Sequence, residues 1–310
     1  MNKVGIQSQG LDTMNVSFDS LKCIYENVKK AGFDCIDFNF DEYLPVNDVF
    51  KGEFGDSFNG DIEEVWKRFE PQFLAAKAAG LIFEQSHAPF PLFVDGDETV
   101  FPVMKDITEK CIDMFGRMGG RYIVVHPVTL AYKYSKEEEI ARNREAFRSL
   151  IPAAKKAGVV ICLENLFLEN NYHLNEGICS DPHDAIRLID ELNDIAGEEL
   201  FGFCFDTGHA NICGKNLYQF IVALGDRIKI LHIHDNDGVS DLHSIPYTFE
   251  RSWAGLSTDW EGFVRGLKDI NYKGNLNFET FRGLTGFPKE VRPAVLQLLA
   301  DVGKHFASLI

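Results

Sequence analysis

Residues 155–165 read KKAGVVICLEN, and this stretch contains the junction that decides the fold. Two lysines end an amphipathic segment, a glycine follows, and a run of β-branched and apolar residues leads to a glutamate. Glycine at the end of a helix adopts a positive φ at little cost, and such an apolar run is typical of a buried parallel strand. The stretch therefore predicts a helix that stops, followed by a buried strand that ends in an ionisable side chain.

The same junction recurs along the chain, and its repetition predicts the architecture. It appears as KKAGFDCIDF (29–38), AAGLIFEQSH (78–87), MGGRYIVVHP (118–127) and ALGDRIKILHIH (223–234). Three further runs, 4–8, 201–205 and 275–278, complete eight expected strands. Helical periodicity lies near 18–31, 61–79, 103–118, 137–156, 182–194, 216–224, 260–269 and 289–307. Since no linker interrupts this alternation, we expect an α/β fold, a single (β/α)8 TIM barrel over residues 1–310; an open doubly wound sheet is the alternative.

Composition narrows the class of protein. The chain has 310 residues, 45% of them hydrophobic and 25% charged, which suits a barrel with a large core. No apolar run approaches the roughly 20 residues of a membrane span, and the first residues lack the apolar core of a secretory signal, so a cytoplasmic protein is expected. A net charge of −16 disfavours nucleic acid as a partner. The seven cysteines form no CxxC pair, which favours reduced, mostly buried thiols.

Long segments follow three of the expected strands. They are residues 39–60, 88–102 and 235–259, after the second, third and seventh strands. In a barrel these segments lie at the carboxyl-terminal face, where barrel enzymes have their active sites. We therefore expect them to cover the mouth of the barrel.

Ionisable side chains occur at the ends of six successive expected strands. They are His87, His126, Glu164, Asp206 with His209, His234 and Glu279. Any one of them alone is typical of an ordinary structural residue, but strand ends in a barrel converge on one axis. Three carboxylates there would repel one another unless a cation lay between them. Oxygen and imidazole ligands suit Mn²⁺, Mg²⁺, Co²⁺ or Zn²⁺, so a divalent metal site is expected at the mouth.

Four segments at these strand ends resemble a known family. LENL (163–166), FDTGHA (205–210), LHIHDNDG (231–238) and NFET (277–280) resemble the xylose-isomerase-like barrel superfamily. That superfamily includes sugar phosphate isomerases and epimerases, ketose 3-epimerases, hydroxypyruvate isomerases and apurinic-site endonucleases. The resemblance covers nearly the whole chain, because SHAPF (86–90) and VVHP (124–127) also fall in their expected strands.

The resemblance implies roles for the residues that match. One metal is expected to be bound by Glu164, Asp206, His234 and Glu279, with His232 in the core or behind the ligands. Glu164 and Glu279 are expected to act as acid and base in an isomerase or epimerase of a sugar, sugar phosphate or polyol-like substrate, through a metal-stabilised enediolate. The expected substrate-binding residues are His87, His126, His209, Asp241, His243, Arg251 and Arg282. Relatives also commonly form homo-oligomers.

Two other functions remain open from the sequence. The endonuclease branch binds additional metals at positions that match His87, His126 and the Asp241–His243 pair, so the alternative is a metal-dependent hydrolase or lyase. Under that reading the chain carries more than one metal. A non-catalytic sugar-binding barrel is the third reading. Arg251 and Arg282 are the only bases well placed for a phosphate group, so a free or conjugated sugar, or a cyclic polyol, is as plausible as a sugar phosphate.

Overall fold

Eight parallel strands form a barrel in the computed structural model, which describes residues 2–249 and 258–310. The strands are β1 (Val4–Gln7), β2 (Cys35–Asn39), β3 (Ile82–His87), β4 (Tyr122–Val124), β5 (Val160–Glu164), β8 (Phe201–Asp206), β9 (Ile228–His232) and β10 (Leu276–Phe278). Their order in the sheet is β10-β1-β2-β3-β4-β5-β8-β9.

The two edge strands of this sheet meet and close the barrel. Ile233, directly after β9, forms an isolated parallel bridge with Phe278 of β10. The Ile233 amide donates to the Asn277 carbonyl at 2.9 Å, and the Glu279 amide donates to the Ile233 carbonyl at 3.1 Å. The barrel is therefore confirmed, and the open-sheet alternative is wrong.

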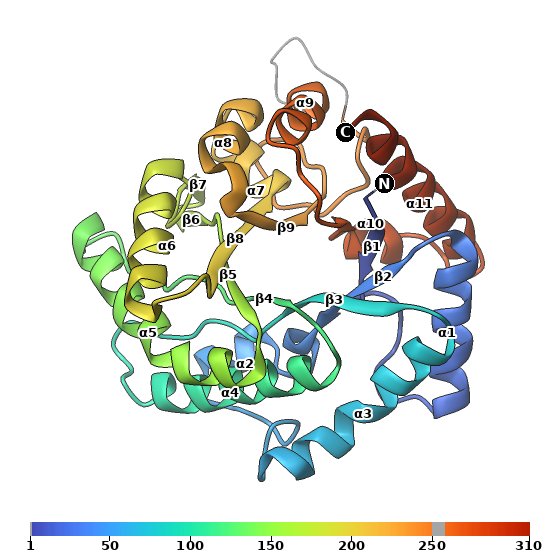
Figure 1. The fold of residues 1–310 in the computed structure, drawn as a ribbon, viewed down its shortest axis with the longest axis horizontal. Helices are drawn as coiled ribbons and strands as arrows, with labels where there is room; N and C mark the ends of the chain where they lie inside the picture. The colour runs from blue at the N-terminus through green and yellow to red at the C-terminus, as the bar shows by residue number, and fades with distance from the viewer. Residues whose placement is uncertain (1, 250–257) are drawn as a thin grey trace.

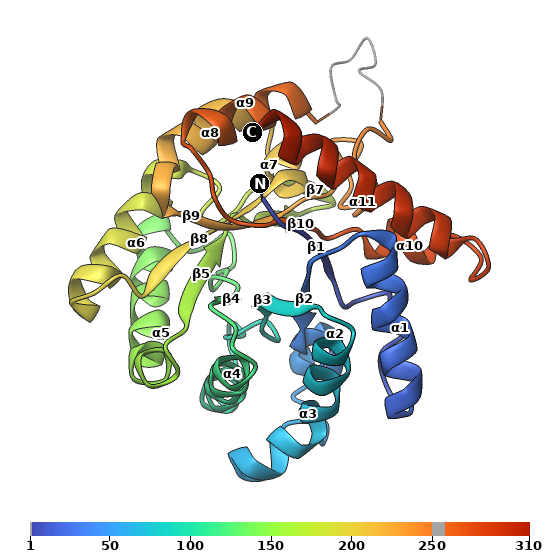
Figure 2. The same cartoon turned by 45° about the vertical axis from the view of Figure 1, so that its right-hand side comes forward.

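Helices surround the sheet on its outer side (Figure 1). They are α1 (Phe18–Ala31), α3 (Ile62–Ala78), α4 (Val100–Arg117), α5 (Lys136–Ala157), α6 (Pro182–Ala196), α8 (Leu217–Leu224), α9 (Trp260–Asp269) and α11 (Arg292–Leu309). The helix-stopping glycines behave as expected, since Gly32 and Gly158 have φ values of 110° and 67°. Figure 2 shows α11 beside α1 and β1, so the last helix packs against the first strand.

The connections at the carboxyl ends of the strands carry short elements. After β2 come η1 (Phe40–Tyr43) and α2 (Val46–Phe50), after β8 comes α7 (Thr207–Ile212), and after β10 comes α10 (Phe281–Thr285), while η2 (Gly225–Arg227) precedes β9. A hairpin of β6 (Phe167–Asn170) and β7 (His173–Glu176) follows β5, and the sequence analysis did not predict it. Its strands are at most half-buried, so they lack the apolar run by which the barrel strands were found.

The barrel interior changes from apolar to polar toward the mouth. Val124, Val160, Cys162, Cys204 and Ile230 form a small buried cluster. Because side chains alternate along a strand, the residues two positions further on point to the same side, and these include His126, Glu164, Asp206 and His232. The larger apolar cluster lies between the sheet and the helices. Among the described residues, none of the helices has the length and apolarity that crossing a membrane requires.

Candidate metal centre at the barrel mouth

Three carboxylates from different strands converge at the carboxyl-terminal end of the barrel. Glu164 and Asp206 are the last residues of β5 and β8, and Glu279 directly follows β10. Their exposed fractions are 1%, 0% and 8%. Within the described part of the chain, the ion-pair partners of all three are histidines, and no lysine or arginine pairs with them.

His232 completes this central group. Ligand atoms of Glu164, Asp206, His232 and Glu279 all lie within 4.8 Å of one another. The Nδ1 atom of His232 is 3.4 Å from Glu164 Oε1 and 3.3 Å from Glu279 Oε2. The structure thus brings together the three predicted carboxylates, with His232 as the histidine of the group.

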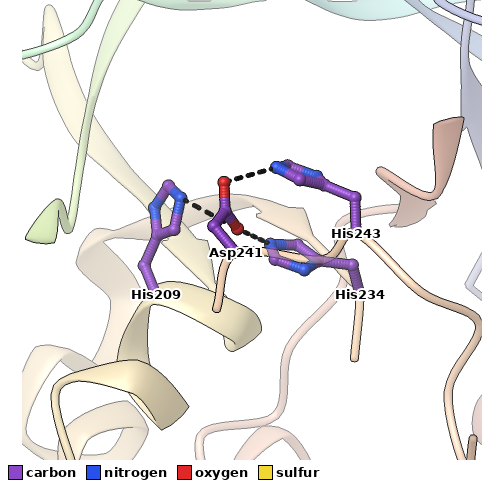
Figure 3. A group of neighbouring side chains, drawn as sticks. All are labelled: His209, His234, Asp241 and His243. Atoms are coloured by element: carbon purple, nitrogen blue, oxygen red, sulfur yellow. Dashed lines mark hydrogen bonds and ion pairs between the residues drawn. The ribbon is translucent and has the colours of Figure 1, made fainter. Parts of the chain in front are cut away.

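His234, the histidine predicted to join the carboxylates, belongs to a second group beside them. It lies with His209, Asp241 and His243, and Figure 3 shows the three imidazoles around the Asp241 carboxylate. Asp241 Oδ2 is 2.9 Å from His243 Nε2, and Asp241 Oδ1 is 3.9 Å from His209 Nε2. His234 Nε2 lies 3.1 Å from Asp206 Oδ2, so the two groups adjoin at that aspartate.

A third group shares Glu164 with the first. It consists of His87, His126 and Glu164. His126 Nε2 is 3.2 Å from Glu164 Oε2, and the Nε2 atoms of the two histidines are 3.0 Å apart. Every described rim residue predicted from the sequence, apart from Arg282, therefore falls into one of three adjoining groups.

The local backbone explains the position of Asp206. Its Oδ1 caps α7 by accepting a hydrogen bond from the His209 amide at 2.6 Å. Asn165, which follows β5, donates to the Asp206 carbonyl and accepts from its amide, both at 2.9 Å. The Thr207 hydroxyl donates to the His234 carbonyl at 2.8 Å. The DTGH segment thus ties the ends of β5, β8 and β9 together.

Burial and neighbouring charges separate the pKa values of the carboxyl groups. Burial raises the pKa of Glu164, but the surrounding histidines, His232 first, outweigh it and hold that pKa well below its usual range. Burial, together with the charges of Glu164 and Asp206, raises the pKa of Glu279 well above its usual range. Burial also lowers the pKa of His126 to about 4. Such divergence between neighbouring carboxyl groups is typical of acid–base sites.

Unpaired atoms indicate that the groups fit a cation. In the part of the chain that the structure describes, four buried atoms of the three groups have no hydrogen-bond partner: Glu164 Oε2, Asp241 Oδ1, His232 Nδ1 and His234 Nδ1. Buried polar atoms without a partner are costly, and a divalent ion would satisfy carboxylate oxygens and imidazole nitrogens together. The donor set therefore fits a bound metal.

Aromatic rings lie against the rim histidines. The ring centroids of Phe90 and His126 are 4.1 Å apart. The corresponding distances are 4.7 Å for Phe281 and His243 and 5.1 Å for Phe167 and His209. Phe167 belongs to the unpredicted hairpin. Such rings can pack against the C–H faces of a cyclic polyol or sugar.

The two predicted bases are placed differently, and one acid was missed. The Arg282 guanidinium donates to the Asp241 carbonyl at 3.1 Å, whereas Arg251 lies outside the described residues.

Asp41, which the sequence analysis did not select, has its Oδ1 atom 3.8 Å from His87 Nδ1. Its position after β2, at a strand end like the others, was the available signal.

Comparisons with known proteins agree with the barrel fold. The family described as xylose isomerase-like TIM barrel matches residues 25–300. An inosose isomerase of Bacillus velezensis is 25% identical over 85% of this chain and 84% of its own length. A D-psicose 3-epimerase of Enterocloster bolteae is 28% identical over 66% of this chain and 64% of its own length. The crystal structure of 3-keto-D-glucoside 4-epimerase from E. coli, 19% identical, superposes with a TM-score of 0.67 over 97% of this chain and 100% of that one.

Proposed function

Since this chain belongs to the xylose isomerase-like TIM barrel family, we propose that it is a divalent-metal-dependent isomerase or epimerase of a sugar, sugar phosphate or polyol-like substrate. The observation that carries the proposal is the group of three buried carboxylates and a histidine within 4.8 Å, with no described lysine or arginine paired to them. The relatives named as an inosose isomerase and a D-psicose 3-epimerase support the same class of reaction.

The proposed metal ligands are Glu164, Asp206, Glu279 and one histidine. Sequence resemblance favours His234, whereas the distances from Nδ1 to Glu164 and Glu279 favour His232. A divalent ion bound there would supply positive charge that stabilises an anionic reaction state. Manganese, magnesium, cobalt and zinc all suit these ligands.

Glu164 and Glu279 are proposed to move the proton. They come from β5 and from the residue after β10, and their ligand atoms lie within 4.8 Å of each other. With the substrate bound beside them, one carboxylate can take a proton from a carbon beside a carbonyl while the other returns a proton. Return to the opposite face gives epimerisation, and return to the neighbouring carbon gives isomerisation. His87, His126 and His209 lie beside Glu164 and can orient hydroxyl groups.

An unphosphorylated substrate is favoured over a phosphate ester. A phosphate usually needs an arginine, a lysine or a cradle of backbone amides. Among the described residues, no lysine or arginine forms an ion pair with Glu164, Asp206 or Glu279, and the Arg282 guanidinium donates to a backbone carbonyl. The aromatic rings beside the rim histidines suit a neutral sugar or cyclic polyol.

A substrate screen tests the function. The purified protein is incubated with keto-sugars, inososes and sugar phosphates in the presence of Mn²⁺, Mg²⁺ or Co²⁺, and product stereochemistry is followed. In D₂O we expect deuterium to enter the substrate carbon, and Glu279→Gln to abolish this exchange. Glu290→Gln, at an exposed position, serves as the matched control. Exchange that persists at the wild-type rate in Glu279→Gln would refute the two-carboxylate mechanism.

A metal-dependent hydrolase or lyase is the second candidate, favoured by the three adjoining ligand groups. Glu164 belongs to the first and the third group, and Asp206 of the first group contacts His234 of the second. Metal counting by native mass spectrometry separates the candidates. One ion per chain supports the isomerase or epimerase, and three ions support the hydrolase.

A further inference from the structure

A buried polar layer lies beneath the proposed metal centre. It consists of one residue from each of four strands, β2, β3, β9 and β10: Asp37, Gln85, His232 and Asn277. Each is at most 1% exposed. Asp37 is therefore a carboxylate sealed inside the barrel, and the proposed chemistry does not use it.

One oxygen of Asp37 collects three hydrogen bonds. Asp37 Oδ2 accepts from Gln85 Nε2 at 2.8 Å and from Asn277 Nδ2 at 2.9 Å, and it lies 3.2 Å from His232 Nε2. A buried charge is costly, and donors from three strands offset part of that cost at Oδ2, while Oδ1 has no hydrogen-bond partner among the described residues. This convergence holds the carboxylate in one orientation.

The contact with Asp37 determines which nitrogen of His232 carries hydrogen. A carboxylate can only accept, so His232 Nε2 must donate. In the neutral ring, Nδ1 then has a free lone pair. That atom lies 3.4 Å from Glu164 Oε1 and 3.3 Å from Glu279 Oε2, and it makes no hydrogen bond.

His232 Nδ1, Glu164 Oε1 and Glu279 Oε2 therefore face one another at distances that leave room for one cation between them. Both carboxyl groups and the imidazole would lose any proton on these atoms when a cation binds there. A histidine that donates one ring hydrogen to a carboxylate and presents its other nitrogen is the usual form of a metal-bound imidazole.

We propose that Asp37 is a positioning residue that holds His232 Nε2 protonated and directs His232 Nδ1 toward Glu164 and Glu279 as the fourth metal ligand. This inference rests on the proposed metal-dependent function and identifies which histidine of the HIH segment binds the ion. His234, whose Nε2 contacts Asp206, then lies outside the central ligand set.

The surrounding packing leaves this layer little freedom. A Cβ atom on Gly5 of β1 would lie 2.5 Å from Asn277 Oδ1, so glycine at that position makes room for the asparagine. Gln85 Nε2 also lies 3.3 Å from the carbonyl of Leu231, the residue before His232. Four strands thus fix the relation between Asp37 and the imidazole.

Asp37→Asn tests the inference because it keeps the shape and removes the charge. Affinity for Mn²⁺ is measured on the full chain without substrate, by competition with a chelator. We expect a loss of about 10–100-fold, the range found when a carboxylate behind a metal-bound histidine is removed. Asp34→Asn, just before β2 at the other end of the barrel, is the matched control and should bind Mn²⁺ as the wild type does.

A double-mutant cycle and a spectroscopic measurement complete the test. If Asp37 acts through His232, the losses in Asp37→Asn and His232→Gln are not additive. In the wild type loaded with Zn²⁺, nitrogen NMR should show His232 with Nε2 protonated and Nδ1 bound to metal, assigned by loss of the signals in His232→Gln. This measurement stands even if Asp37→Asn does not fold.

The outcomes separate the inference from the proposed function. Unchanged Mn²⁺ affinity in folded Asp37→Asn, additive losses, or a protonated Nδ1 in the loaded protein would each overturn the inference and leave the function standing. Metal binding as expected without any turnover of sugars or polyols would overturn the function and leave the role of Asp37 standing. A wild-type chain that binds no divalent ion would overturn both.

Discussion

At the residue scale, the two histidines of the HIH segment differ because the chain leaves the barrel between them. His232 is the last residue of β9, and its ring remains inside the barrel. Ile233 closes the barrel against Phe278, and His234 then lies over α7. Alternation along a strand puts both histidines on one side, but it does not tell where the strand ends.

Gly208 is expected to be intolerant of any side chain. A Cβ atom there would lie 1.9 Å from His234 Cε1. In an open helical position, Gly→Ala stabilises by about 0.5–1 kcal/mol. We expect Gly208→Ala to lower the free energy of unfolding instead, by about 1–3 kcal/mol, as overpacking does. Urea unfolding measures the effect. The double variant Gly208→Ala/His234→Ala should recover part of the loss, and a fully stable single variant would contradict the prediction.

Glu42 should make stability depend on pH. Burial raises its pKa from 4.5 to about 7, and its Oε2 makes no hydrogen bond. The folded state therefore holds a proton that the unfolded state releases between these two values, so stability falls as pH rises through this window. Since one pKa unit corresponds to 1.36 kcal/mol, the free energy of unfolding should fall by about 3 kcal/mol across this window.

Comparison with Glu42→Gln isolates this group. The free energy of unfolding is measured with urea at pH 5 and at pH 8. As the pH rises, that of the wild type should fall relative to that of the variant, because glutamine does not titrate. A difference between the two proteins that is the same at both pH values would show that Glu42 has an ordinary pKa in the fold.

At the element scale, the helix–glycine–strand junctions predicted the barrel strands because each carries its own signal. The glycine needs a positive φ, and the strand after it is buried on both sides, so both features appear in consecutive residues. The β6–β7 hairpin has no such signal. Its turn residues Asn171 and Tyr172 adopt positive φ values of 51° and 63°, and Tyr172 is 94% exposed. Nothing in its composition marks it as sheet.

The start of α5 depends on a capping box that can be tested. The Ser135 hydroxyl accepts from the Glu138 amide, and the Glu138 carboxylate accepts from the Ser135 amide at 2.7 Å. Ser135→Ala leaves a helix amide unpaired, and we expect a loss of about 1 kcal/mol in unfolding free energy. Chemical denaturation measures it. Ser57→Ala is the control, since its hydroxyl caps no helix, and equal losses in the two variants would argue against the cap.

At the scale of the whole molecule, closure of the barrel produces the site. Glu164, Asp206 and Glu279 are distant in sequence, and they meet because the ends of β5, β8 and β10 point to one opening. Their mutual repulsion is a cost to the fold that a cation would remove. Stability and metal binding should therefore be linked.

Divalent metal is expected to raise the stability of the entire chain. A ligand that binds only the folded state adds about 2.7 kcal/mol at 100 times its dissociation constant. The temperature of thermal unfolding is compared in excess Mn²⁺ and in excess EDTA at equal ionic strength. Glu279→Gln removes one proposed metal ligand, so Mn²⁺ should raise the unfolding temperature of this variant less. An identical unfolding temperature in metal and in chelator would contradict a metal centre at the barrel mouth.

The sequence by itself determined the barrel, the carboxylates at its strand ends and the end of the barrel where the predicted site residues meet. These features depend on local periodicity and on the position of a residue within its own strand. Only the tertiary structure decided how the rim residues divide into three groups, that His232 rather than His234 lies among the three carboxylates, and that Asp37 lies 3.2 Å from His232 on its other side. Those relations depend on the register between strands and on where β9 ends, and distances across a closed barrel leave no pattern along the chain.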